Sequence, residues 1–249
     1  MNRPRHAPPP APPPAPGCQV PALILAAGRG ERMRPLTDHT PKPLLPVRGK
    51  PLIEWHLEAL AASGVSEVVI NTAWLEDQFL AALGDGRRWG LRIRYSMEGR
   101  DHGGALETAG GIVQALPLLQ SDLFWVLAGD VFMPGFRFEA SWVGRLEASR
   151  DSGHLWLVPN PPQHPLGDFA LSPQGRVQAR DSASGPPGHT YSTVGLLHAR
   201  LVQGVQPGER AALRPHFDAA IAQDRLSGSL HLGPWVDVGT PERWAALQD

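Results

Sequence analysis

The chain has 249 residues, of which 42% are hydrophobic and 19% charged, so it can bury the core of one large domain or two small ones. Its net charge of −1 excludes non-specific binding of nucleic acid through bulk charge, and its single cysteine, Cys18, excludes an intrachain disulfide. No apolar run approaches the roughly 18 residues of a membrane helix, and a signal-peptide segment is missing, so we expect a cytoplasmic protein without membrane or nucleic-acid partners.

Residues 1–19 are rich in proline and alanine, and we expect a disordered or polyproline tail ahead of a domain at 20–249. Such a tail is either a ligand for a proline-recognising partner or a passive extension, and we favour the extension. The apolar run from Ala22 to Ala26 then predicts a buried strand that ends in a glycine-containing loop.

This loop, Ala27-Gly28-Arg29-Gly30, has features of a phosphate-binding site. Its glycines allow positive φ and close approach of a ligand to the amides, and the cations Arg32 and Lys42 follow. Exposed N–H groups with cations nearby suit a polyphosphate. The alternative is an ordinary turn between a strand and a helix, with its arginines in solvent. Met33 replaces the third glycine of the dinucleotide-binding motif, and the Gly-Lys-Ser/Thr ending of a P-loop is absent.

Up to Asp130 the pattern alternates strands with helices. Strands are expected at 67–71, 91–95 and 123–128, and helices at 51–63, 74–83 and 107–116. Several of these strands are apolar throughout, which predicts a parallel sheet covered on both faces. Ligands of such sheets bind outside the carboxyl ends of the strands, so Gly28 and Asp130, each just past a strand, are placed to face one cleft.

After Asp130 the spacing of the elements changes. Short strands are expected at 154–158, 190–197, 230–232 and 235–238, a hairpin joins 167–169 to 176–179, a loop covers 181–188, and helices lie within 210–223 and begin at Pro241. No internal repeat is present, which excludes an appended left-handed β-helix.

Asp130 and Asp237 each adjoin apolar runs. Asp130 could cap a turn, whereas Asp237, between Val236 and Val238, is costly to bury without a partner. Alternatively both carboxylates converge on the phosphate loop and hold Mg²⁺, a cation that takes oxygen ligands and bridges phosphates. Zinc-site histidine spacing and the Gly-x-Ser-x-Gly motif are absent, which favours phosphoryl-type transfer over covalent catalysis.

Five motifs, in this order, resemble those of the sugar-1-phosphate nucleotidylyltransferase family: Leu25-Ala-Ala-Gly-Arg-Gly-Glu-Arg-Met33, Pro35-Leu-Thr37, Pro41-Lys-Pro-Leu44, Gly129-Asp130 and Trp235-Val-Asp-Val-Gly-Thr240. The resemblance runs from about residue 20 to the C-terminus. The short length and the segments 70–75, 106–108 and 167–169 are most similar to the subfamily of uridylyltransferases that act on N-acetylmuramate α-1-phosphate in cell-wall sugar recycling. The family implies an α/β fold, with a Rossmann-like, mostly parallel sheet flanked by helices and a smaller sugar-binding β lobe.

The resemblance also implies a reaction and its residues. UTP and a sugar 1-phosphate would give a UDP-sugar and pyrophosphate with Mg²⁺ as cofactor, and we expect a monomer or weak oligomer. The family's signature arginine and lysine match Arg32 and Lys42, and its metal ligands match Asp130 and Asp237. Nucleotide contacts match Ala26, Ala27, Gly28, Gly30, Glu98 and Thr108, and sugar contacts match Gly167, Asp168 and Ser192.

Two departures from the subfamily pattern affect the expected substrate pocket. Residues 99–105 form a longer connection than is usual, and Thr193 stands where the subfamily usually has glycine. A mannose-1-phosphate guanylyltransferase, or another sugar-1-phosphate nucleotidylyltransferase, is therefore an alternative within the family. A catalytically silent, nucleotide-binding regulatory subunit is an alternative of another class, and retention of Arg32, Lys42 and both aspartates argues against it. A proline-rich interaction module would account only for the tail.

Overall fold

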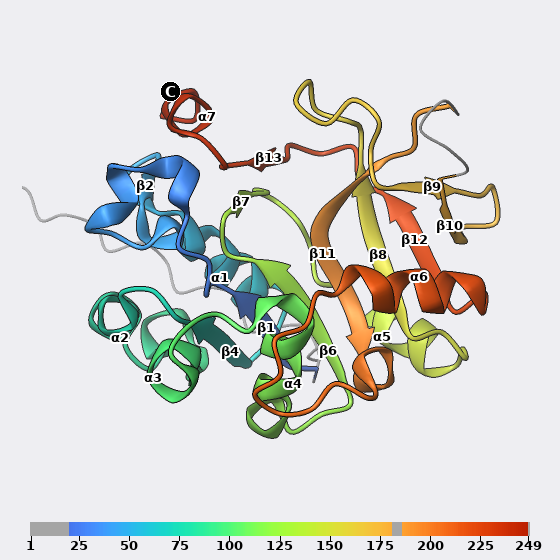
Figure 1. Cartoon of the computed structure of the whole chain (residues 1–249), viewed down its shortest axis with the longest axis horizontal. Helices are drawn as coiled ribbons and strands as arrows, with labels where there is room; N and C mark the ends of the chain where they lie inside the picture. Colours follow the sequence, from blue (N-terminus) through green and yellow to red (C-terminus); the bar gives the residue numbers. More distant parts are fainter. Residues whose placement is uncertain (1–19, 181–185, 249) are drawn as a thin grey trace, which may run out of the picture.

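A seven-stranded sheet runs through the molecule in the order β12-β8-β11-β6-β1-β4-β5 (Figure 1). The computed structural model describes residues 20–180 and 186–248, so the predicted tail at 1–19 and most of the loop predicted at 181–188 lie outside the described residues. In chain order the strands are β1 (Ala22–Leu25), β4 (Glu67–Thr72), β5 (Arg92–Met97), β6 (Leu123–Ala128), β8 (Gly153–Val158), β11 (Thr190–His198) and β12 (Leu226–Leu230).

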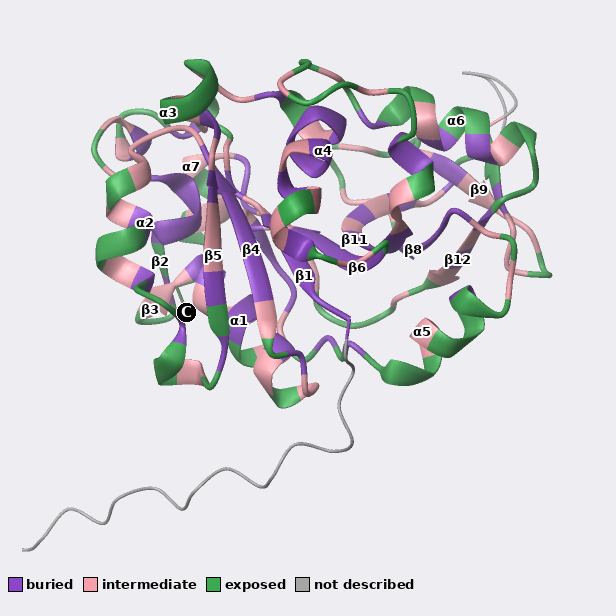
Figure 2. Cartoon of the chain, turned by 90° about the horizontal axis from the view of Figure 1, so that it is seen from below, coloured by how far each residue is buried: buried purple, intermediate pink, exposed green. Residues whose placement is uncertain are grey.

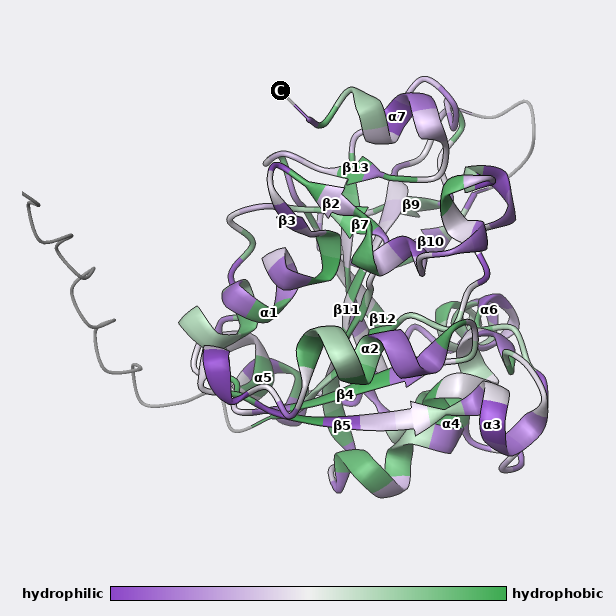
Figure 3. Ribbon diagram, turned by 90° about the vertical axis from the view of Figure 1, so that its left-hand side faces the viewer, coloured by the Kyte–Doolittle hydropathy of each residue, from purple (hydrophilic) through white to green (hydrophobic). Residues whose placement is uncertain are grey.

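The half of the sheet from β6 to β5 is parallel, as the alternating pattern predicts. Its connections contain α1 (Leu52–Ala62), α2 (Glu76–Leu83), α3 (Glu98–His102) and α4 (Glu107–Leu119). α1 and α2 lie on one side of the strands and α4 on the other (Figure 3). Because both faces are covered, consecutive residues such as Leu23 and Ile24 are fully buried. The predicted α/β fold class is confirmed.

The other half of the sheet carries the smaller lobe. β11 is antiparallel to both β6 and β8, whereas β12 is parallel to β8. Beside these strands lie helix α6 (Arg214–Ala222) and a hairpin of β9 (Phe169–Leu171) with β10 (Val177–Ala179). Two short pairs complete the strands: β2 (Pro46–Val47) with β3 (Lys50–Pro51), and β7 (Val131–Phe132) with β13 (Val236–Asp237). Helix α7 (Pro241–Ala245) follows β13.

One buried core continues through both halves of the sheet (Figure 2). The fully buried Trp125 of β6 lies 5.1 Å from Phe138 and 5.3 Å from Trp156 between ring centroids, which links the parallel strands to β8. A second, smaller core joins the region after β1 to the C-terminal segment, and it consists of Met33, Leu45, Val47, Leu52, Phe132, Val238 and Leu247. The C-terminal segment is thereby packed against Met33, which follows the glycine loop.

Several elements differ from the sequence-based expectation, which contains neither α3, α5 (Ala140–Glu147) nor the two-residue strands β2, β3 and β7. α3 has only five residues, and the apolar stripe of α5, formed by Trp142, Val143 and Leu146, spans little more than one turn. The strand expected at 230–232 is β12 at 226–230, where the buried Leu226 and Gly228 alternate with serines and give a weak strand signal. No helix in the described part of the chain is long and apolar enough to cross a membrane.

Candidate active site

The glycine loop leaves β1 and leads into a short 3-10 helix, η1 (Glu31–Met33). Gly30 has φ 70° and ψ 40°, and a Cβ there would lie 3.1 Å from Thr37 Cγ2 and 3.3 Å from Lys42 Cβ. Thr37 Oγ1 donates to the Gly30 carbonyl over 2.8 Å, which fixes the turn. Gly28 is exposed and has open space around it. The loop therefore presents backbone rather than side chains to an approaching ligand.

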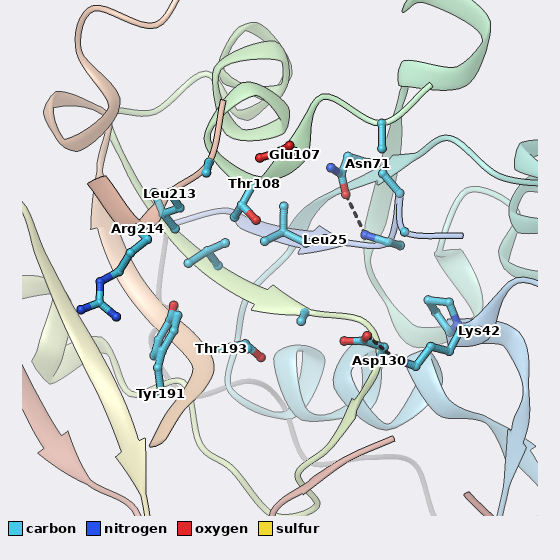
Figure 4. Close-up of a pocket in the computed structure, with 18 of the residues that line it drawn as sticks. Leu25, Lys42, Asn71, Glu107, Thr108, Asp130, Tyr191, Thr193, Leu213 and Arg214 are labelled. Carbon is cyan, nitrogen blue, oxygen red and sulfur yellow. Dashed lines mark hydrogen bonds and ion pairs between the residues drawn. The ribbon is translucent and has the colours of Figure 1, made fainter. Parts of the chain in front are cut away.

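A cavity of about 800 Å³ lies outside the carboxyl ends of β1, β4 and β6 and extends to the smaller lobe (Figure 4). Both Gly28 and Asp130 line it, so the cleft expected from the strand ends is present. Eight of the residues predicted for the site line this cavity: Ala26, Ala27, Gly28, Gly30, Lys42, Thr108, Asp130 and Asp168. The five predicted residues that do not line it are Arg32, Glu98, Gly167, Ser192 and Asp237.

Lys42 and Asp130 form an ion pair at the edge of the cavity. Lys42 begins the 3-10 helix η3 (Lys42–Leu44) between two prolines, and its side chain is 8% exposed. Its Nζ lies 2.6 Å from Oδ2 of Asp130, whose side chain is 37% exposed (Figure 4). A buried ammonium must be paired, and this one is held beside the end of β6. The pair places a cation and an anion in the same cavity that Gly28 and Gly30 of the loop line.

The backbone on either side of Asp130 is held by two hydrogen bonds. The Val238 amide donates to the Asp130 carbonyl over 3.2 Å. His56 of α1 donates from Nε2 to the Val131 carbonyl over 2.8 Å. Burial lowers the pKa of His56 to about 4, against weaker raising effects of the Val131 hydrogen bond and the Asp130 charge. A neutral His56 with its proton on Nε2 thus anchors the strand that follows Asp130.

The backbone of Asp237 lies close to that of Asp130, but the side chain of Asp237 pairs with Arg243 rather than with Lys42. β13 pairs with β7 so that Asp237 lies opposite Val131. Its Oδ2 accepts from Arg243 Nη1 over 2.7 Å, and it lines a second cavity of about 450 Å³. Gly239 leaves room for this pair, since a Cβ there would lie 2.3 Å from Arg243 Nη2. No group of three or more His, Cys, Asp or Glu able to hold a metal ion occurs among the described residues.

On the β4 side of the cavity, Asn71 connects the loop to a buried carboxylate. Asn71 Oδ1 accepts from the Ala26 amide over 2.7 Å, and its Nδ2 donates to Glu98 Oε1 over 2.7 Å. Glu98 is fully buried and also accepts from the Leu106 amide over 2.8 Å. Burial raises the pKa of Glu98, and both hydrogen bonds oppose the rise. Glu98 therefore lies behind Asn71 and reaches the cavity only through it, and Asn71 is a lining residue that the sequence assignment omits.

In the smaller lobe, Asp168 lines the cavity, whereas Gly167 and Ser192, the other two predicted sugar contacts, do not. Asp168 Oδ2 accepts from the Tyr191 amide over 2.8 Å, and His164 Nε2 lies 3.1 Å from its Oδ1. Gly167 has φ 67°, and a Cβ there would lie 2.6 Å from Asn160 Oδ1. Ser192 is fully buried and donates to the Trp156 carbonyl over 2.7 Å.

Two further features concern side chains around the cavity. Arg32 is exposed on η1 and does not line the cavity. Arg214, at the start of α6, does line it and stacks over Phe169 with 4.5 Å from its Cζ to the ring centroid. Sequence reasoning misses Arg214 because α6 is separated from the glycine loop by most of the chain and carries no motif.

Comparison with known proteins identifies the class of enzyme. Residues 21–167 match the family model described as nucleotidyl transferase. The chain belongs to the nucleotidyl transferase family. It is 50% identical over 224 residues to N-acetylmuramate alpha-1-phosphate uridylyltransferase of Neisseria meningitidis, covering 88% of this chain and 93% of that protein. It is 31% identical to mannose-1-phosphate guanylyltransferase of Mycobacterium tuberculosis, over 90% of this chain and 62% of the relative. These relatives confirm the prediction of a sugar-1-phosphate nucleotidylyltransferase.

Two solved structures share the fold. A Bacillus anthracis protein provisionally described as a glucose-1-phosphate thymidylyltransferase, in complex with sucrose, has a TM-score of 0.77 at 18% identity, covering 92% of this chain and 96% of that one. HddC from Yersinia pseudotuberculosis, complexed with GMP-PN, has a TM-score of 0.69 at 18% identity, covering 92% and 98%. At this identity the likeness concerns the fold alone.

Proposed function

We propose that this nucleotidyl transferase joins UTP to N-acetylmuramate α-1-phosphate, giving UDP-N-acetylmuramate and pyrophosphate, a step of cell-wall sugar recycling. The observation that carries the proposal is the 50% identity, over most of both chains, to the Neisseria uridylyltransferase. The cavity supports it, because one continuous space touches the glycine loop, the Lys42–Asp130 pair and Asp168.

The geometry suggests how the substrates divide the cavity. The amides of the loop from Gly28 onward would take the triphosphate, because the Ala26 amide already donates to Asn71. Asn71 and Thr108 would lie on the nucleoside side. Asp168 would accept hydrogen bonds from sugar hydroxyls at the opposite end. Arg32, exposed beside the loop, would approach the β- and γ-phosphates from solvent.

The reaction itself is a displacement at phosphorus. A phosphate oxygen of the sugar 1-phosphate attacks the α-phosphorus of UTP, and the bond from that phosphorus to the oxygen of the departing pyrophosphate breaks. Two anions must approach each other, so a held cation at the reacting centre lowers the barrier. Lys42 supplies that cation, and its pairing with Asp130 fixes where the ammonium lies. The chain's contribution is thus mainly positioning and electrostatic stabilisation.

Asp130 and Asp237 fit a site for Mg²⁺, which proteins commonly hold by one or two carboxylates together with substrate phosphates. Asp130 directly precedes β7, Asp237 lies in β13, and these two strands pair with each other. The side chains of Asp130 and Asp237 are partly exposed, at 37% and 30%. Mg²⁺ bound there would neutralise developing charge on the phosphates. Lys42 and Arg243, their present partners, would keep both carboxylates oriented until substrate arrives.

The test is a substrate survey with the purified protein. UTP, GTP and dTTP are each combined with N-acetylmuramate α-1-phosphate, mannose 1-phosphate and glucose 1-phosphate, and pyrophosphate release is measured with Mg²⁺ and with EDTA. We expect the highest kcat/KM for UTP with N-acetylmuramate α-1-phosphate, and loss of turnover in EDTA. A preference for GTP with mannose 1-phosphate would replace this assignment by that of the Mycobacterium relative. UTP binding without pyrophosphate release from any pair would indicate a regulatory subunit.

A further inference from the structure

Thr193 has a backbone conformation that its residue type rarely adopts. Its φ is 67°, in the left-handed region, where a β-branched side chain is an outlier. It lies in an irregular stretch of β11, since Tyr191 pairs with Leu157 while Gly195 pairs with Leu155. Such outliers persist only where the surrounding structure fixes them, and they concentrate at ligand sites.

The peptide groups on both sides of Thr193 are fixed by hydrogen bonds. Trp235 Nε1 donates to the Ser192 carbonyl over 3.0 Å. Ser192 Oγ accepts from the Val194 amide over 3.1 Å and donates to the Trp156 carbonyl over 2.7 Å. The two residues that flank Thr193 are therefore tied to the core and to the C-terminal segment. Thr193 cannot relax without breaking these bonds.

The hydroxyl of Thr193 is buried and has no hydrogen-bond partner among the described residues. Within that part of the chain, the other buried side-chain atoms without a partner belong to Arg94, Arg180 and His231, and none of these residues lines the main cavity. Thr193 does line it, and Figure 4 places it between Tyr191 and Asp130. Leaving a buried hydroxyl unpaired is costly, so a partner supplied by a ligand would recover that free energy.

We propose that the Thr193 hydroxyl hydrogen-bonds the sugar 1-phosphate and helps to select the sugar. The inference rests on the proposed function, because it takes the cavity end near Asp168 as the sugar end. Thr193 lies between that end and the Lys42–Asp130 pair, so its hydroxyl meets the part of the sugar that carries the phosphate.

Thr193→Val tests the role of the hydroxyl, because valine keeps the shape and the branch at Cβ. We expect the KM for N-acetylmuramate α-1-phosphate to rise about five- to tenfold, the range expected for one lost hydrogen bond. The KM for UTP should not change, and Thr193→Ser should restore the sugar KM. Thermal stability should not fall, since no hydrogen bond within the described protein is lost.

Thr190→Val is the matched structural control on the same strand. Its hydroxyl donates to Asn160 Oδ1 over 2.9 Å, and it does not line the cavity. This variant should lower the Tm while leaving the ratio of the two KM values unchanged. An unchanged sugar KM in Thr193→Val, or an equal rise in both KM values, would overturn the inference.

The two proposals can fail separately. If the wild-type protein prefers another nucleotide and sugar 1-phosphate, the proposed function fails, and the Thr193 comparison is made with that pair. If it turns over no pair, calorimetric titration with N-acetylmuramate α-1-phosphate decides by whether Thr193→Val weakens binding. If the wild-type protein uses N-acetylmuramate α-1-phosphate and Thr193→Val behaves identically, only the role of Thr193 fails.

Discussion

At the scale of single residues, Lys42 carries the strongest prediction for catalysis. Its ammonium is almost fully buried and is the cation that the chain itself holds 2.6 Å from Asp130. Lys42→Ala and Asp130→Asn are each expected to lower kcat by about 10²-fold or more, the usual loss when one electrostatic contact to a transition state is removed. Pyrophosphate release measured under saturating UTP and sugar phosphate gives the comparison.

Arg92→Ala is a suitable control for that experiment. Arg92 is an exposed cation at the edge strand β5, where it pairs with Glu67 over 3.1 Å, far from the cavity lining. Exposed pairs of this kind contribute little to stability, and its loss should not change kcat. Near-normal turnover in either the Lys42 or the Asp130 variant would remove that residue from the reacting centre.

Asp237 allows a separate prediction about the metal. Asp237→Asn keeps a side chain that can accept from Arg243 but removes the negative charge beside the backbone of Asp130. We expect the Mg²⁺ concentration for half-maximal rate to rise at least tenfold, because Mg²⁺ prefers charged oxygen ligands. Titration of the rate with Mg²⁺ measures this, and an unchanged curve would show that Asp237 serves only its ion pair with Arg243.

At the scale of elements, α4 packs so closely on β4 that it shapes the nucleotide end of the cavity. Gly111 faces the Asn71–Glu98 bond, and a Cβ there would lie 2.7 Å from Asn71 Nδ2 and 2.8 Å from Glu98 Oε1. Gly111→Ala should therefore break a buried hydrogen bond and destabilise the fold by about 1–3 kcal/mol. It should also raise the KM for UTP, since Asn71 holds the Ala26 amide. Urea denaturation and initial rates measure the two effects.

Gly144→Ala in α5 is the matched helix substitution. Nothing lies within 4 Å of a Cβ at Gly144, so alanine meets no clash there. Replacing an unneeded helical glycine should stabilise the protein by about 0.5–1 kcal/mol without changing the rate. If Gly111→Ala behaved like Gly144→Ala, the Asn71–Glu98 connection would have no part in holding the loop.

At the scale of the whole molecule, two buried histidines make stability depend on pH. Burial lowers the pKa of His56 and of His154 to about 4 from the ordinary value of 6.5. His154 is held by Ser227 Oγ and Ser229 Oγ, each 3.0 Å from a ring nitrogen. The unfolded chain therefore binds more protons than the folded one between pH 6.5 and 4, and stability falls as pH decreases through that window.

The expected loss is about 2 kcal/mol for each histidine between pH 7 and pH 5. Urea denaturation at several pH values measures it. His154→Gln, which keeps a polar side chain next to the two serines, should remove about half of the pH dependence. A variant with the same slope as the wild type would show that His154 is not kept neutral by its surroundings.

The sequence alone determined the parallel half of the fold and part of the cavity lining, because these rest on local signals. A buried strand shows in the sequence as an apolar run. The glycine or aspartate that follows the run must then lie at the carboxyl edge of the sheet, where ligands bind. That is why Gly28 and Asp130 could be expected to face one cleft, and both line the cavity, while Lys42 and Asp168, expected from the family resemblance, line it as well. The family followed from the order of the motifs and was confirmed by comparison.

Only the tertiary structure decided which of the expected side chains line the cavity. Glu98 and Ser192 are assigned to substrate by the family resemblance, yet packing buries both fully, Glu98 against Asn71 and Ser192 against the Trp156 carbonyl. Arg214 comes to the cavity through the placement of α6 against distant segments, and a contact of that kind leaves no local periodic pattern. Asn71, by contrast, ends the strand expected at 67–71 and carries the same strand-end signal as Asp130. The left-handed backbone at Thr193 depends on hydrogen bonds from Trp235 Nε1 to the Ser192 carbonyl and from the Val194 amide to Ser192 Oγ, so it exists only once the chain has closed on itself.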